Sequence, residues 1–260
     1  MLLAAERYDE ALAAISEWLP SFADTRDPDL LVSVFWAAAL ASLGSGRLDE
    51  ARRYAMLAEE ANGRLTPHHA VHGVALRLMV EELGGRWSAV LALNEEARER
   101  VAANVATPCV FNPRSLLVCA VASVEAGQGE EARQLEAAAD ALGMEGYGLS
   151  IDAPRVRLAL LRGDLETVRR SLAPPPTVMS FTRVGGLAVR LDGLAALHDR
   201  GRIEEEAPPF LLPNTYLEPF ALRALGLVRD DDRLVAKALA RFRAMGLDWH
   251  AAQTSALAGR

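Results

Sequence analysis

Three histidines lie close together in the chain, and their type and spacing suit metal binding: His68, His69 and His72. His68 and His72 are four residues apart, so on an α-helix they would share one face and offer two imidazole nitrogens to a metal ion. A zinc site needs a third protein ligand, and the His-Glu-x-x-His motif is absent from the sequence. We therefore interpret these residues as solvated histidines near a helix start, and we expect no bound metal and no cofactor.

Two further groups of residues have simple structural interpretations. Asp230, Asp231 and Asp232 would attract a cation, but three acids at a helix N-terminus are explained by capping and by the helix dipole. Cys109 and Cys119 match neither a disulfide framework nor a zinc pattern. We assign no ligand to either group.

No catalytic constellation stands out in the sequence. The chain has no Gly-x-x-x-x-Gly-Lys-Ser/Thr phosphate loop and no Gly-x-Ser-x-Gly nucleophile motif. A hydrolase within a helical fold is the least favoured hypothesis, because it would need acids, bases or a metal gathered in one cavity. We predict that the protein is not an enzyme.

A short stretch from Gly46 to Ala51 recurs along the chain and sets the positions of the elements. Gly46 follows an apolar run and can adopt the left-handed conformation that closes a helix. Asp49 and Glu50 then lie in the first turn of the next helix, where negative charge suits the dipole. Weaker copies begin at residues 6, 85, 127, 163, 201 and 230, so the successive intervals, with 46 included, are 40, 39, 42, 36, 38 and 29 residues. This recurrence indicates repeated pairs of helices.

The recurring stretch resembles the segment that joins helix A to helix B in tetratricopeptide repeat (TPR) proteins. Most intervals exceed that family's repeat of about 34 residues, and the tryptophan and the Leu-Gly pair of its helix A are largely missing. The resemblance implies an all-α, TPR-like α-solenoid, which is a right-handed superhelix, with about six antiparallel helix pairs. We expect one TPR-like domain over residues 1–260, with a hinge at residues 173–181, where three consecutive prolines break the pattern.

Helix-start and helix-stop signals predict the individual helices. A capping residue before proline marks a start, as at Asp27-Pro28 and Asn112-Pro113. Residues 1–19 are predicted to hold the tail of one helix and then a full helix. The further predicted helices span 28–43, 47–62, 67–83, 86–104, 113–126, 129–142, 152–162, 164–172, 183–199, 202–207, 215–228, 231–246 and 248–257. The repeat at the N-terminus lacks most of its first helix, so we expect an exposed apolar face there that offers a homodimer contact.

Composition restricts the partners and the location. The net charge of −7 opposes nonspecific nucleic-acid binding, which needs a basic surface. The sequence has no run of about 18 apolar residues that would span a membrane, and no signal peptide. We therefore expect no direct contact with nucleic acid, no membrane insertion and, by default, a cytoplasmic location.

Residues 219–226 and 240–254 resemble the closing segment of certain bacterial helical-repeat regions. Those regions follow an ATPase module in LuxR-type transcription activators and in cyclase-like signalling proteins. The resemblance implies a sensor or scaffold role in bacterial signalling or transcription regulation. Because the phosphate loop and a terminal basic helix-turn-helix are absent, we expect this chain to correspond to the repeat region alone.

The TPR register also implies which side chains face the concave groove of the solenoid. Groove positions of the A helices fall on Trp36, His72, Met79, Arg114, Arg157, Leu191 and Phe220. Aromatic, methionine and arginine side chains are typical of binding anchors, although they also pack between helices. Both interpretations stay open for Trp36 and Phe220, and we favour binding for Arg114 and Arg157.

The resemblances together favour a non-catalytic interaction or sensor module. Its groove would bind a peptide, a protein partner or a small effector, and the ligand would stabilise one curvature of the solenoid. The alternative is a free-standing adaptor or a self-assembling scaffold protein, which light scattering would distinguish from a monomeric sensor domain.

Overall fold

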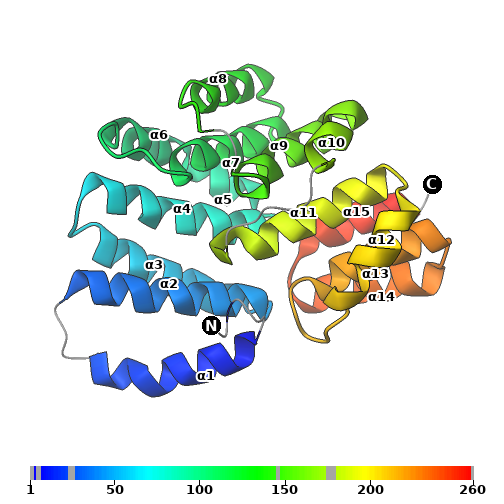
Figure 1. Cartoon of the computed structure of the whole chain (residues 1–260), viewed down its shortest axis with the longest axis horizontal. Coiled ribbons are helices and arrows are strands. Elements are labelled where there is room, and N and C mark those ends of the chain that lie inside the picture. Colours follow the sequence, from blue (N-terminus) through cyan, green and yellow to red (C-terminus); the bar gives the residue numbers. More distant parts are fainter. Residues whose placement is uncertain (1–2, 4–6, 23–26, 145–146, 174–179, 259–260) are drawn as a thin grey trace. The chain divides into compact units, whose positions relative to one another are not determined.

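The computed structural model is built from α-helices. It describes residues 3, 7–22, 27–144, 147–173 and 180–258. Within these ranges it contains fifteen α-helices, three short 3-10 helices and no strand (Figure 1). The all-α prediction is therefore confirmed for the described residues. None of these helices combines the length and the apolar character that a membrane span requires.

Two compact units divide the chain. The first comprises Met1–Leu83 and Trp87–Glu145, and the second comprises Gly84–Arg86 and Gly146–Arg260. The main division thus falls between residues 145 and 146. The hinge predicted at residues 173–181 lies within the second unit, and residues 174–179 of it lie outside the described residues.

The first unit is a stack of antiparallel helices. Its elements are α1 (Tyr8–Trp18), η1 (Leu19–Phe22), α2 (Pro28–Gly44), α3 (Leu48–Asn62), α4 (Pro67–Leu83), α5 (Trp87–Ala92), α6 (Asn94–Ala103), α7 (Phe111–Glu125) and α8 (Gly129–Asp140). The helices α1 to α4 pack in chain order, each on the next, and α7 packs against α4, α5, α6 and α8 (Figure 1). Helix α7 is buried along nearly all of its length, so it forms the centre of this part of the core.

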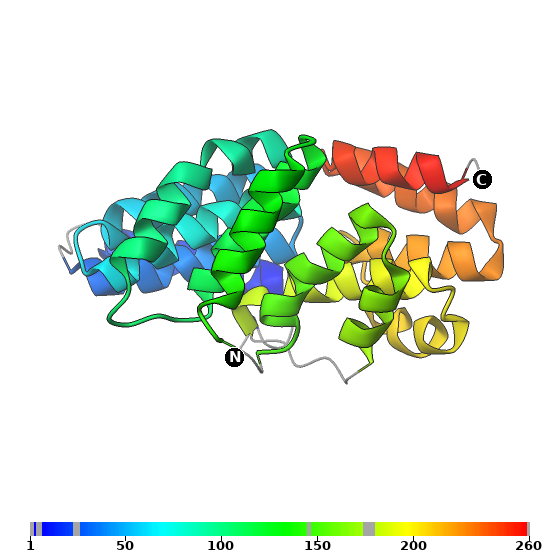
Figure 2. The same cartoon turned by 90° about the horizontal axis from the view of Figure 1, so that it is seen from above.

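The second unit is arranged around α11. Its elements are α9 (Leu149–Arg162), α10 (Leu165–Leu172), η2 (Ser180–Thr182), α11 (Arg183–Ala196), α12 (Arg200–Glu206), η3 (Pro208–Phe210), α13 (Glu218–Arg229), α14 (Asp232–Ala244) and α15 (Asp248–Ala258). Helix α11 contacts α9, α10, α12 and α13, and α14 joins α13 to α15 (Figure 2). Large apolar side chains such as Tyr216, Phe220 and Phe242 fill the space between these helices.

The recurring stretch that was first noted at Gly46 forms the same backbone turn at several places in both units. Gly46 has a φ of 68°, and the next amide, that of Arg47, donates to the carbonyl of Ser42 at 2.8 Å. This is the six-to-one bond of the Schellman motif, which closes a helix through a left-handed residue. The same bond runs from Gln128 to Ser123, from Asp164 to Ala159, from Asp199 to Leu194, from Asp231 to Gly226 and from Leu247 to Phe242. The sequence repeat thus encodes a repeated backbone turn.

Three local predictions were wrong. Asn112, the predicted cap residue, lies inside α7, which already begins at Phe111. The helix predicted over 86–104 is two helices, α5 and α6, which meet at Leu93, and the break allows both to pack on α7. The turn expected at Gly201 lies three residues earlier, at His198, whose φ is 51°. The reason is that Asp199 caps α12 by accepting a hydrogen bond from the amide of Arg202 at 3.2 Å, which places Gly201 inside the helix.

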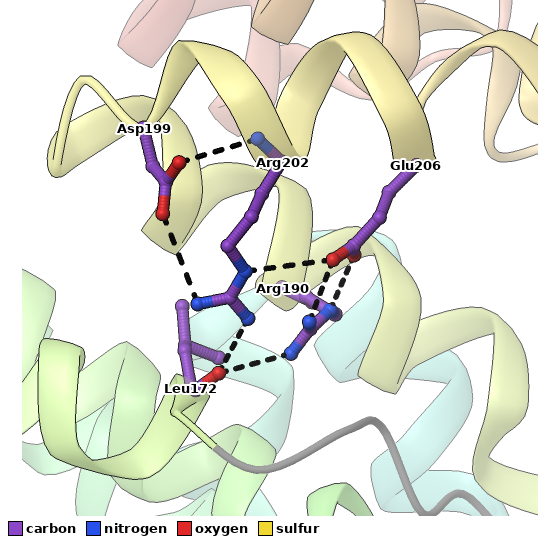
Figure 3. A network of polar contacts seen from close by, with 5 residues as sticks. All are labelled: Leu172, Arg190, Asp199, Arg202 and Glu206. Atoms are coloured by element: carbon purple, nitrogen blue, oxygen red, sulfur yellow. Dashed lines mark hydrogen bonds and ion pairs between the residues drawn. The ribbon is translucent and has the colours of Figure 1, made fainter.

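A polar network holds the short helices α10 and α12 against α11. The carbonyl of Leu172, at the end of α10, accepts hydrogen bonds from Arg190 of α11, at 3.3 Å, and from Arg202 of α12 (Figure 3). Arg190 also donates to Glu206 at 2.7 Å. Burial by itself raises the pKa of Glu206, but the guanidinium groups of Arg190 and Arg202 outweigh it and lower that pKa. The network satisfies a helix-end carbonyl and anchors α12 just before Pro208 and Pro209 end it.

Candidate functional site

The seven predicted groove residues are divided between the two units. Trp36, His72, Met79 and Arg114 belong to the first unit, and Arg157, Leu191 and Phe220 belong to the second. Among the seven, the structure brings together the rings of Trp36 and His72, whose centroids are 5.8 Å apart. Both side chains are partly exposed.

Three of the predicted groove residues are part of the core. The exposed fractions of Met79, Leu191 and Phe220 are 3%, 1% and 0%. The ring of Phe220 lies 5.0 Å from that of Tyr216 and 4.9 Å from that of Phe242, measured between centroids. Packing between helices therefore accounts for these side chains in the present conformation, and a direct contact with a ligand stays a prediction.

The two predicted groove arginines are buried and paired with acids. Arg114 of α7 forms an ion pair with Glu82 of α4. Arg157 of α9 pairs with Asp192 of α11, with 2.9 Å between Nη1 and Oδ2. A ligand that engaged either arginine would first have to separate it from a buried carboxylate.

Asp192 lies at the centre of a larger buried cluster. Arg223 of α13 donates to its second carboxylate oxygen, and the Arg157 guanidinium lies 5.3 Å from the ring centroid of Trp249. Burial by itself raises the pKa of Asp192, but the positive charges of Arg223 and Arg157 outweigh it, so the pKa is lowered. The cluster therefore keeps a charged carboxylate inside the helix packing.

A different cluster forms around the histidines of α4 and includes a residue that the sequence did not assign to them. His68 and His72 stand on one face of α4, with ring centroids 4.4 Å apart. The Sγ atom of Cys109, in the segment before α7, lies 3.4 Å from Nε2 of His72. One donor atom from each of His68, His72 and Cys109 lies within 4.8 Å of the other two. We call these three residues the His-Cys triad.

The segment that carries Cys109 is fixed by two buried asparagines. Asn112 Oδ1 accepts hydrogen bonds from the backbone amide of Cys109, at 3.0 Å, and from Nδ2 of Asn104, at 3.1 Å. Asn104 also donates to the carbonyl of Thr107 at 3.0 Å. The same carbonyl lies 2.9 Å from Nδ1 of His68, so it accepts the ring N–H of that histidine. These bonds hold the cysteine and the histidine in place from the same segment.

Aromatic rings border the His-Cys triad. The ring centroid of Phe111 lies 4.8 Å from that of His72 and 5.4 Å from that of Trp36. Burial lowers the pKa of His72 to about 4, with further contributions from the charges of His68 and His69. At neutral pH His72 is therefore an uncharged imidazole with a lone pair.

Burial has the opposite effect on the thiol of the triad. It raises the pKa of Cys109, and the backbone amides of Phe111 and Asn112 offset part of this rise. The thiol is thus protonated at neutral pH. Its Sγ lies 3.4 Å from Nε2 of His72 and donates toward Oδ1 of Asn112 at 3.5 Å. Two imidazoles and one thiol are all ligands that borderline-soft metal ions accept.

The sequence pointed to the histidine pair but not to Cys109. The thiol is 37 residues away from His72 along the chain, and it reaches α4 because α7 packs on α4. The two asparagines that orient the segment lie eight residues apart, at the end of α6 and within the first turn of α7. None of these relationships has a fixed spacing that a motif search would detect.

A surface depression lies beside α3, α4 and α5. Its lining includes Met56, which is exposed, and the charged residues Arg52, Glu59 and Arg77. Arg77 pairs with Glu59 at 2.7 Å, so charges on this surface neutralise one another. This leaves the triad and its aromatic border as the better candidate for recognition.

Comparisons of the chain with family models, with curated proteins and with solved structures found no match.

Proposed function

We propose that the protein is a non-catalytic binding module that recognises a peptide, a protein partner or a small effector, in bacterial signalling or transcription regulation. The proposed architecture is a TPR-like, right-handed array of antiparallel helix pairs. The recurrence of one Schellman turn and the packing of consecutive helices support it. Such arrays display ligand-contacting side chains on repeated helix faces.

The contact between Trp36 and His72 carries this proposal. Both residues occupy predicted groove positions, and their rings meet and remain partly exposed. Phe111, at the start of α7, is buried and packs against both rings. A partly exposed indole beside a polar imidazole suits a ligand that has an apolar or aromatic group and a hydrogen-bonding group.

Ligand binding at this surface would act on more than one helix. Trp36 lies on α2 and His72 on α4, so one ligand would contact two helices that are separate in sequence. A ligand that prefers one arrangement of these helices would increase its population. An attached or associated protein would then respond to that arrangement.

A comparison of two variants tests this proposal. The wild type, Trp36→Ala and Met56→Ala would be purified from the native host, and the co-purified peptides and small molecules would be identified by mass spectrometry. We expect at least one compound to be retained by the wild type and by Met56→Ala but not by Trp36→Ala, with calorimetry confirming the binding. Equal retention of every compound by the wild type and Trp36→Ala would contradict the proposal.

One observation favours the alternative, a free-standing adaptor or self-assembling scaffold. Trp18, at the end of α1, is 64% exposed, and tryptophan is enriched at protein interfaces. It lies on the helix that begins the array, where we expected a homodimer contact. Size-exclusion chromatography with light scattering tests this alternative. A dimer that dissociates in Trp18→Ala would support it, and a monomeric wild type at high concentration would reject it.

A further inference from the structure

We propose that His68, His72 and Cys109 form a binding site for a zinc ion. This inference goes beyond the proposed recognition function and does not depend on it. It rests on the position of three donor atoms, on the hydrogen bonds that orient them and on the chemistry of the donors.

The distances between the donor atoms suit a tetrahedral metal ion. Zinc binds histidine nitrogen at about 2.0–2.1 Å and cysteine sulfur at about 2.3 Å, so two such ligands at a tetrahedral angle lie about 3.6 Å apart. The observed separation of His72 Nε2 and Cys109 Sγ is 3.4 Å. All three donors lie within 4.8 Å of one another. Small side-chain rotations would therefore complete the coordination, and the backbone would not have to move.

Hydrogen bonds hold two members of the triad in place. His68 uses Nδ1 to donate to the carbonyl of Thr107, which leaves Nε2 with its lone pair available. Zinc-binding histidines commonly donate their other ring N–H to a backbone carbonyl in this way, which fixes the ring and its tautomer. The amide of Cys109 is held by Asn112, so the thiol also comes from a fixed segment.

The exchange of a proton for the metal also balances. In the metal-free protein the Cys109 thiol carries a proton and its Sγ lies 3.4 Å from Nε2 of His72. Zinc would replace this proton: the S–H bond breaks, a Zn–S bond forms, and the proton passes to solvent. Affinity for zinc should consequently increase with pH.

Three protein ligands leave a fourth coordination position for water or for a ligand. His72 of the triad lies beside the partly exposed Trp36, so we place this position next to the Trp36 ring. Zinc would also link α4 to the segment that precedes α7, which adds a connection between two helices that already pack together. Zinc binding should therefore make this pair of helices more resistant to unfolding.

The test uses the full chain, stripped of metal with a chelator and then titrated with Zn²⁺. We expect one zinc ion per chain in competition with a chromophoric chelator, and no binding of Mg²⁺, which prefers oxygen ligands. Replacing zinc by Co²⁺ should give a thiolate-to-cobalt charge-transfer absorption that Cys109→Ala abolishes. A wild-type cobalt complex without that absorption would overturn the proposal.

Matched variants identify the ligands. Cys109→Ala and His72→Gln should each weaken zinc binding by about 100-fold or more, because each removes one of three ligands. His69→Gln is the control, since His69 is the neighbouring histidine outside the triad, and it should bind zinc within about threefold of the wild type. Undiminished binding by Cys109→Ala, or an equal loss in His69→Gln, would overturn the assignment.

A chemical readout on the wild type guards against variants that fail to fold. Zinc should slow the alkylation of Cys109, measured by mass spectrometry of the digested chain. Cys119 is the internal control: it is fully buried, and burial raises the pKa of its thiol to about 12, so it should be unreactive with or without zinc. An alkylation rate of Cys109 that zinc leaves unchanged would contradict the site.

Discussion

The Asp192 cluster of the second unit and the His-Cys triad of the first unit are built in similar ways, but their charges differ. Each gathers polar side chains from separate helices or segments. In the Asp192 cluster, one carboxylate lies between two guanidinium groups, Arg157 and Arg223. In the triad, all three members are lone-pair donors. The opposite charges of the Asp192 cluster neutralise each other, whereas three lone-pair donors can together coordinate a metal cation.

In the second unit, Arg223 makes further contacts besides its ion pair with Asp192. Its Nη1 donates to the hydroxyl of Thr254 at 2.9 Å. Its guanidinium lies 5.2 Å from the ring centroid of Phe220 and 4.9 Å from that of Phe242. The second cluster is therefore paired within the helix packing, and we propose ligand binding only for the first.

The largest expected effect comes from removing the central charge of the second cluster. Asp192→Asn keeps the shape of the side chain but leaves two buried guanidinium groups without their counter-charge. We expect the free energy of unfolding to fall by about 3–5 kcal/mol, as measured by urea denaturation with circular dichroism.

An exposed ion pair provides the control for Asp192→Asn. Glu166 pairs with Arg169 on the surface of α10, so Glu166→Ala should change the free energy of unfolding by less than about 0.5 kcal/mol. If Asp192→Asn lowered the free energy of unfolding no more than Glu166→Ala does, the Asp192 cluster would not stabilise the fold.

The next effect is a pH dependence that arises in the first unit. The pKa of His72 is about 4 in the folded chain and about 6.5 when the chain is unfolded. Between these values the unfolded state binds more protons, so the stabilisation is complete above pH 6.5 and is lost as the pH falls toward 4. Because His72 is partly exposed, solvent screening reduces the effect, and we expect a loss of roughly 1–2 kcal/mol.

The measurement is a series of urea unfolding curves from pH 7 to pH 4 on the metal-free protein. His72→Gln should remove most of the slope over this range. His69→Gln, which removes the adjacent histidine, should retain most of it. A slope that His72→Gln leaves intact would show that the burial of His72 is not its source.

The sequence predicted the local structure well, because local signals determine it. The Gly46 turn and the bounds of the helix over residues 67–83 were predicted from residues that lie within or beside them. The failures were also local: Asp199 capped its helix in competition with the turn expected at Gly201. The sequence around residue 200 contains both a capping residue and a turn glycine, and tertiary packing determines which of the two sets the helix start.

Only part of the candidate site, the histidine pair, could be predicted from the sequence. The four-residue spacing of His68 and His72 follows from helix geometry, but the approach of Cys109 depends on how α7 packs against α4. For the same reason, the groove register did not indicate that Arg114 would pair with Glu82, or Arg157 with Asp192. Pairing partners on different helices are set by tertiary packing, which no single spacing in the sequence records.

A smaller effect compares the same turn in the two units. The left-handed position is Gly46 in the first unit and Asp230, with a φ of 53°, after α13 in the second. Glycine adopts this conformation without the steric cost that a Cβ atom imposes, although it loses more conformational freedom on folding. We expect Asp230→Gly to raise the free energy of unfolding by about 0.5 kcal/mol and Gly46→Asp to lower it. Thermal unfolding of both variants would show this, and a destabilised Asp230→Gly would mean that the carboxylate has a structural role.

The smallest expected effect is that of Cys109 on the stability of the metal-free protein. If the triad serves a ligand and the Asp192 cluster serves the fold, then Cys109→Ala should change the free energy of unfolding of the metal-free protein by less than about 0.5 kcal/mol. The thiol is only partly buried, and the segment around it is held by Asn104 and Asn112 without it. Urea unfolding in the presence of a chelator measures this change. A loss above about 1.5 kcal/mol would place Cys109 with Asp192 among the structural polar groups, because a site kept for a ligand has no reason to stabilise the empty protein.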